Sequence, residues 1–363
     1  MYSFRYRLMG NLKRYCRSGA VSLLVVFLWS AYTVCGQMRE ALVAVPGAHI
    51  RYRDSGGTGV PVIFLHSASG NRDAWEQQIG AFTASGYRVI TYDRRGWGHS
   101  VDEPGNAQPW TAAGDLLAVV NRLGIDRFHL VSTALGGYVG FDFAISHPDR
   151  LRSLVVANSL GGLQDPQLVE LGRRLRSKEF DALPVEIREL GPEYRAANAE
   201  GVKRWLEHEK DSRHKGSPAP STPLTNRLTL ALLETISTPV LLLTGDADLY
   251  APPSLQNIFS AHIKRVETAV IPGVGQQRVL GGAGSVQPHR AGLFGHAIAC
   301  SPCLNAGTSR NCFNLLESHP NRRRRPNRKS SKRVHDGEPD INSQTRHYLT
   351  DFIRNTQVIP LRY

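Results

Sequence analysis

Short apolar runs alternate with longer amphipathic stretches from residue 40 onward, and this alternation limits the folds open to the chain. Helical patterns occupy residues 74–84, 111–123 and 136–146. They separate most of the continuous apolar runs, which lie at residues 60–66, 87–93, 128–133, 151–159, 238–246 and 266–273. Continuous apolar runs of this length are typical of parallel strands buried on both faces. Strands that alternate with helices predict an α/β sheet with right-handed crossovers.

Two further segments modify this pattern. Near the start of the alternation, ALVAV and HIRYRDSG are separated by Pro46-Gly47, which is a hairpin signal. Between residues 160 and 236 the sequence is helical and charged and lacks a strand pattern, and residues 215–223 have the composition of a loop. We therefore expect a hairpin before the parallel strands and a helical insertion between two of them.

The formal net charge of +13 lies almost entirely at the two ends of the chain. Residues 1–36 hold five basic residues and no acidic one, and residues 276–363 hold 14 basic and 5 acidic residues. The middle is left with 25 basic and 26 acidic residues, a net charge of −1. A nucleic-acid-binding domain needs a concentrated basic surface, so we expect no nucleic-acid partner for the globular part.

The N-terminus has the composition of a targeting segment. A basic stretch precedes an apolar run of 15 residues at 20–34, and small residues at Val34 and Gly36 suit cleavage that leaves Gln37 first. Three interpretations stay open: a cleaved export signal, an uncleaved membrane anchor at residues 20–36, or a wrongly chosen start codon. The first two predict an exported protein, periplasmic or secreted, or a membrane-anchored one. All five cysteines lie outside residues 37–275, which therefore offer no thiol nucleophile.

Five motifs, taken in order, resemble those of the α/β-hydrolase superfamily, of the AB hydrolase-1 type. They are FLHSASGNRDAW (64–75), YDRRGWGHS (92–100), STALGG (132–137), RSLVVANS (152–159) and LLLTGDADLYAPP (241–253). The resemblance implies a mostly parallel eight-stranded sheet flanked by helices, with a helical cap over its carboxyl edge. It also implies a site at the strand ends, a small-molecule substrate of the ester type, and no cofactor or metal.

The resemblance assigns roles to particular positions, and two of these positions hold inert residues. The family places its nucleophile at the centre of G-x-S-x-G on a strained strand-to-helix turn, and here that position is Ala134. The histidine base should follow VETAVIPGVG, where the chain has Gln276. Asp248 occupies the position of the triad acid, and Asp246 is the less favoured choice.

The backbone donors that stabilise an oxyanion are implied at Ala68 and Leu135. Several alternatives remain beside these assignments. Ser132 or Thr133 could be a displaced nucleophile, although both precede the turn and are expected to point into the sheet. Asp248 could cap its loop without a chemical role. The histidines His66 and His99 are expected to be structural hydrogen-bonding residues rather than bases.

The family pattern stops after Gly275, where a histidine and a final helix are expected. Back-translation of residues 279–294 with a shift of one base permits WEEPEAFNRTVLDFL, which looks like the missing helix. We therefore expect a frameshift or misread boundary near Gln276, with residues 279–363 an out-of-frame or disordered basic tail. On this interpretation the zinc-like spacing of His296, Cys300, Cys303 and Cys312 and the basic stretch 321–333 are not sites.

These observations predict five segments: a targeting segment at 1–36, core at 37–160, a helical cap at 161–236, core at 237–278, and the tail at 279–363. The predicted function is that of an α/β-hydrolase-fold protein related to small-molecule ester-type hydrolases, weak or inactive in serine-triad chemistry. The alternative is a non-catalytic protein that binds a small molecule in the same pocket. A third, weaker hypothesis is a different chemistry that uses no nucleophile.

Overall fold

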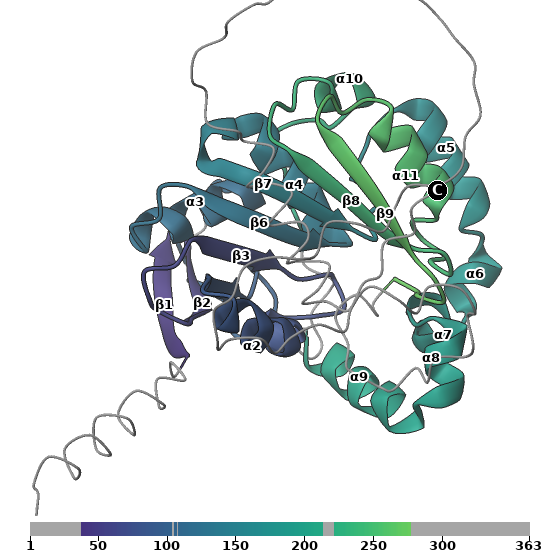
Figure 1. Ribbon diagram of the computed structural model, residues 1–363, viewed down its shortest axis with the longest axis horizontal. Helices are drawn as coiled ribbons and strands as arrows, with labels where there is room; N and C mark the ends of the chain where they lie inside the picture. The colour runs from purple at the N-terminus through teal and green to yellow at the C-terminus, as the bar shows by residue number, and fades with distance from the viewer. Residues whose placement is uncertain (1–37, 104, 107, 213–220, 277–363) are drawn as a thin grey trace, which may run out of the picture. The chain divides into compact units, whose positions relative to one another are not determined.

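The computed structural model describes residues 38–103, 105–106, 108–212 and 221–276, all of which belong to one compact unit. Within these residues nine strands form one sheet (Figure 1). The strands are β1 (Arg39–Val45), β2 (Ala48–Asp54), β3 (Pro61–Leu65), β4 (Arg88–Tyr92), β5 (Val101–Asp102), β6 (Phe128–Thr133), β7 (Leu151–Ala157), β8 (Val240–Gly245) and β9 (Val266–Ile271).

The strand order is β1-β2-β4-β3-β6-β7-β8-β9, with β5 paired to β2 outside this path. Strands β1, β2 and β5 make antiparallel pairs, and β2 also pairs antiparallel with β4. The pairs from β4 through β3, β6, β7 and β8 to β9 are all parallel. The predicted hairpin and the mostly parallel sheet are confirmed. The expected count of eight strands is one short because β5 adds a ninth strand.

Helices follow most of the parallel strands. Residues 74–84, predicted as one helix, divide into a 3₁₀ turn, η2, and a helix, α2; residues 111–123 and 136–146 contain α3 and α4. The helical elements are η2 (Arg72–Trp75), α2 (Glu76–Ala84), α3 (Ala112–Arg122), α4 (Leu135–Ser146), η3 (Pro148–Arg150), α5 (Pro166–Leu175), α6 (Lys178–Ala182), α7 (Val185–Glu189), α8 (Pro192–Ala197), α9 (Ala199–Asp211), α10 (Leu230–Leu233) and α11 (Pro253–Ser260).

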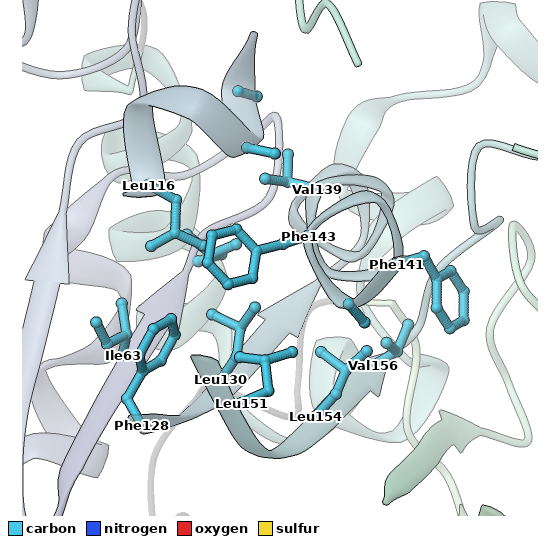
Figure 2. Packing of buried hydrophobic residues seen from close by; sticks show 14 of the residues in the cluster. Ile63, Leu116, Phe128, Leu130, Val139, Phe141, Phe143, Leu151, Leu154 and Val156 are labelled. Carbon is cyan, nitrogen blue, oxygen red and sulfur yellow. The ribbon is translucent and has the colours of Figure 1, made fainter. Parts of the chain in front are cut away.

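The sheet separates two clusters of buried apolar side chains. Successive residues of a strand point to opposite faces, so in β3 Ile63 belongs to one cluster, whereas Val62 and Phe64 belong to the other. Figure 2 shows the larger cluster, in which Val139 and Phe143 of α4 lie above the sheet. Burial on both faces explains why the parallel strands are apolar along their whole length.

Helices α5 to α10 come between β7 and β8 in the chain, and within the described residues this segment contains no strand. Figure 1 shows α6 to α9 beyond the carboxyl ends of the strands. Contacts confirm this placement: Arg188 Nη1 of α7 donates to Tyr250 Oη after β8 (2.9 Å), and Ser69 Oγ after β3 donates to Glu189 Oε2 of α7 (2.6 Å). The helical segment therefore covers the edge where the predicted site lies.

Candidate functional site

A single residue, Ala134, makes the turn between β6 and α4. Its φ of 47° and ψ of −116° are unusual for a residue with a side chain and indicate local strain. Three hydrogen bonds hold this backbone: Ala134 N donates to Ala157 O of β7 (3.0 Å), and Ala134 O accepts from Ser159 Oγ (2.7 Å) and Gly137 N (3.0 Å). The turn is the strained strand-to-helix elbow that presents a nucleophile in α/β-hydrolases, and at its apex is a methyl group.

Two glycines allow α4 to start this close to the sheet. A Cβ atom at Gly136 would lie 2.7 Å from Leu65 O and 2.9 Å from His66 O, at the end of β3. A Cβ atom at Gly137 would overlap the side chain of Ser159. The first turn of α4 therefore packs against the loop that follows β3. Leu135 is the first residue of the helix and lies next to that loop, and its N–H has no acceptor within the helix.

The loop after β3 is held by His66, which is fully buried. Its Nε2 accepts from Arg94 N (2.9 Å), so the ring proton lies on Nδ1, which donates to Ser67 O (2.7 Å). Burial lowers the pKa of His66 well below its ordinary value, so the ring is neutral. Both ring nitrogens are engaged, and His66 is the structural residue that the sequence predicted. Ala68 is exposed between the buried Ser67 and Ser69.

The carboxyl group of Asp248 lies after β8 and is buried. Its Oδ1 accepts from Tyr250 N (2.8 Å) and Ala251 N (3.0 Å), whereas Oδ2 has no hydrogen-bond partner among the described residues. Burial raises the pKa of the Asp248 carboxyl to about 6, against the two backbone N–H bonds, which lower it. Asp246 is exposed and accepts from Gly273 N (2.6 Å), so it fixes the neighbouring loop.

Asn158 ties the predicted base position to the same edge of the sheet. It follows β7 with a φ of 48°, and its Nδ2 donates to Gly275 O (3.1 Å) and Gln276 O (2.6 Å). Its Oδ1 accepts from Gly245 N (3.2 Å) at the end of β8. Gln276 is thereby held in a buried position beside the strand ends that carry Ala134 and Asp248. Sequence reasoning missed Asn158, although asparagine after an apolar strand is a residue that tolerates positive φ.

Comparison with known proteins agrees with this geometry. A model of the alpha/beta hydrolase family matches residues 62–296. The chain belongs to this family. The curated relatives of this α/β hydrolase include a Caulobacter vibrioides protein named as a proposed carbamate hydrolase, RutD. The two sequences are 38% identical over 122 residues, which make up 33% of this chain and 45% of that protein. Another is the 2-hydroxy-6-oxononadienedioate/2-hydroxy-6-oxononatrienedioate hydrolase of Paraburkholderia phymatum, 31% identical over 43% of this chain and 52% of that protein.

The α/β hydrolase thus spans about half the length of these curated relatives. Among solved structures, a thermophilic esterase from Thermogutta terrifontis superposes with a TM-score of 0.55 and 26% sequence identity. This match covers 67% of the present chain and 93% of the esterase. These comparisons show the family and the fold. The hydrolases among the relatives support a hydrolase-like member of this family.

The hydroxyl groups beside the elbow of the α/β hydrolase are shielded from solvent. Ser132 Oγ donates to Val155 O of the neighbouring strand (2.8 Å), and both Ser132 and Thr133 are completely buried. Neither residue can serve as a displaced nucleophile in this conformation. The prediction for His99 was wrong in part: its backbone N–H donates to Asp93 Oδ2 (2.9 Å), but its exposed side chain forms no hydrogen bond with any described residue.

A groove of about 580 Å³ opens beside the elbow. Its lining includes Leu135 and Tyr138 of α4, Gly162 and Gln164, and residues 222 and 224–228 of the loop before α10. Asp142 of α4 fixes that loop by accepting from Thr225 N (2.8 Å) and Asn226 N (2.9 Å). The same helix therefore carries the elbow at its start and holds one wall of the groove.

The described residues contain no group of three histidine, cysteine, aspartate or glutamate side chains placed to bind a metal ion. Within them, no helix is both long enough and apolar enough to cross a membrane. The apolar run 20–34, the zinc-like cysteine spacing, the basic stretch 321–333 and the predicted tail from 279 lie outside the described residues.

Proposed function

We propose that this α/β hydrolase is related to small-molecule ester-type hydrolases and is weak or inactive in serine-triad chemistry. The observation that carries the proposal is the methyl group of Ala134 at the apex of a turn with the strained backbone of an elbow. Triad members act as a unit, and loss of the nucleophile or the base alone costs roughly 10⁶ in kcat. Gln276 at the base position cannot accept a proton near neutral pH, so two members of the unit are missing.

The remaining parts of the site support the relationship to active hydrolases. We assign Ala68 N–H and Leu135 N–H as the oxyanion donors and Asp248 as the triad acid. The buried Asp248 Oδ2 has no hydrogen-bond donor in the part of the chain that the structure describes, and a histidine at the base position would supply one. A residual effect over water of about 10³ is expected from oxyanion donors and binding alone.

A second candidate function is that of a small-molecule binder without hydrolysis. The groove of about 580 Å³ favours it, because its volume lies in the range of small-molecule sites and it opens next to Leu135. Export, membrane attachment through residues 20–36, and the division of the chain at residues 160/161, 236/237 and 278/279 stay predictions.

The test uses four variants: Ala134→Ser, Gln276→His, the double variant, and the double variant that also carries Asp248→Asn. The assay is hydrolysis of p-nitrophenyl acetate. Serine alone has no base to accept its proton, and histidine alone faces a methyl group, so each single variant should stay near the background rate. The double variant should turn over substrate, and Asp248→Asn should reduce that rate. The gains should be strongly non-additive.

Two results would contradict the proposal directly. If the unmodified chain turns over p-nitrophenyl acetate and Ser132→Ala or Thr133→Ala abolishes this, the nucleophile has been placed wrongly. If the Gln276→His variant is active and Ala134→Ser adds nothing to it, alanine belongs to the mechanism and the serine-esterase assignment fails.

A further inference from the structure

Arg94 is a buried cation without an acidic partner among the described residues. It follows β4, is only 4% exposed, and its guanidinium lies 4.0 Å from the centre of the Trp97 ring. Nη2 donates to Ser67 O (3.1 Å), Nη1 donates to Thr222 Oγ1 (3.3 Å), and Nε has no partner among the described residues. Its neighbour Arg95, in contrast, forms a two-pronged ion pair with Asp115.

A charge buried without an oppositely charged partner lowers the stability of the folded protein. Burial lowers the pKa of Arg94 to about 10, so the side chain still carries its charge at neutral pH. Keeping the charge in this position costs the free energy of its lost hydration. A charge kept in this position therefore calls for a role other than stability, and its contacts indicate what that role is.

Donors from Arg94, His66 and Trp97 hold two successive peptide groups of the loop after β3. Ser67 O accepts from both Arg94 Nη2 and His66 Nδ1, and Ala68 O, on the next peptide, accepts from Trp97 Nε1 (2.9 Å). Because a trans peptide is planar, the Ala68 N–H points away from Ser67 O, that is, away from Arg94 and His66. Two donors on the carbonyl oxygen also polarise the peptide and strengthen its N–H as a donor.

We propose that Arg94 is a positioning residue that orients and polarises the Ser67–Ala68 peptide, so that Ala68 N–H prefers an anionic oxygen, as in a carboxylate or phosphonate ligand, to a neutral ester oxygen. This rests on the proposed function in one respect, the assignment of Ala68 N–H as an oxyanion donor. In the described part of the chain this N–H makes no hydrogen bond, and Ala68 is exposed at the site. With no nucleophile at Ala134, the expected result is anion binding without turnover.

The first test observes the peptide itself and needs no ligand. The full chain is labelled with ¹⁵N-alanine, and the Ala68 amide resonance is identified by its loss in Ala68→Gly. Arg94→Gln should move the Ala68 amide proton upfield by more than any other alanine amide, and Arg94→Lys, which keeps the charge, should move it less. Thr222→Val is the matched control, because it removes the other acceptor of Arg94 and leaves the bond to Ser67 O intact.

The second test measures binding of the butyl methylphosphonate monoanion and of neutral butyl acetate by isothermal titration calorimetry. The unmodified chain should prefer the phosphonate. Arg94→Gln should weaken phosphonate binding about tenfold, as expected for loss of a charge-assisted contribution, with butyl acetate little changed.

An unchanged Ala68 resonance in Arg94→Gln, or an equal loss of affinity for both ligands, would show that Arg94 is only structural and would overturn the proposal. If Arg94→Gln does not fold, Arg94→Lys decides. An Ala68 amide proton shifted as far as that of an amide whose peptide oxygen accepts no hydrogen bond overturns the proposal. An Ala68 amide resonance near its original position supports the proposal. If neither ligand binds the unmodified chain, the ligand-binding function fails, and the amide resonance still decides the role of Arg94.

Discussion

Asp248→Asn tests the cost of ionising a buried carboxyl group whose Oδ2 has no hydrogen-bond partner among the described residues. In the folded protein Asp248 is 3% exposed, and among the described residues only its Oδ1 finds hydrogen-bond donors. Asparagine keeps the same shape and an oxygen that can accept from Tyr250 N and Ala251 N, but it carries no charge at any pH. The substitution therefore isolates the cost of ionising this buried group.

The magnitude follows from the pKa of Asp248, which burial raises from 3.8 to about 6. The folded state thus binds the proton more tightly than the unfolded state, and stability must fall as the pH rises between these two values. The benefit of protonation is fully present below about pH 4 and is lost above about pH 6. A difference of about two pKa units corresponds to roughly 2–3 kcal/mol. The free energy of unfolding should therefore fall by this amount between pH 4 and pH 7, because Asp248 becomes ionised.

The measurement is urea unfolding of the full chain and of Asp248→Asn at intervals from pH 4 to pH 7.5. Across this range the free energy of unfolding of Asp248→Asn should rise by roughly 2–3 kcal/mol relative to that of the unmodified chain. Any fixed cost of burying the amide cancels, because it does not depend on pH. Asp246→Asn, at an exposed carboxylate on the same loop, is the control and should not show this trend. Parallel stability curves for Asp248→Asn and the unmodified chain would refute the reasoning.

Three further substitutions can be measured by urea unfolding at pH 7. Asp115→Ala should destabilise the fold by about 3–5 kcal/mol, because it leaves the buried Arg95 without its partner at 2.7 Å. Gly136→Ala should cost about 1–3 kcal/mol, because the added methyl group would lie 2.7 Å from Leu65 O. Ala134→Gly should instead stabilise the protein by about 1 kcal/mol, because glycine adopts a φ of 47° without strain. A change of opposite sign in any of the three would contradict its stated cause.

The sheet could be predicted because each parallel strand is a continuous apolar run, and burial on both faces demands that composition. The hairpin could be predicted from the Pro46-Gly47 turn between β1 and β2. The ninth strand could not. Strand β5 has two exposed residues, Val101 and Asp102, and it exists through its pairing with Ala48 and His49. A pair of residues is too short to show any periodicity.

The elbow was predictable for a similar reason, since its frame and its glycines are adjacent in the sequence. The hydrogen bonds that fix the rest of the site join residues that are far apart in the sequence. Asn158 reaches Gln276 across 118 positions, and Arg94 reaches Ser67 across 27. Nothing near either residue in the sequence indicates these partners. The position of Asp248 after a strand was visible as well. Its burial, and the lack of a partner for Oδ2 within the described part of the chain, depend on packing.

The geometry of the elbow shows that its shape does not depend on a nucleophile. The strained backbone of Ala134 is held by hydrogen bonds from Ser159 and Gly137 and to Ala157, none of which involves the side chain at the apex. Strain of this kind persists only where the surroundings fix it, and here the packing of α4 against β3 does so through Gly136. Serine and alanine differ at such a position by one oxygen atom. The backbone that would aim a hydroxyl is therefore already in place, and under the proposed function this turn differs from an active elbow in the side chain at its apex.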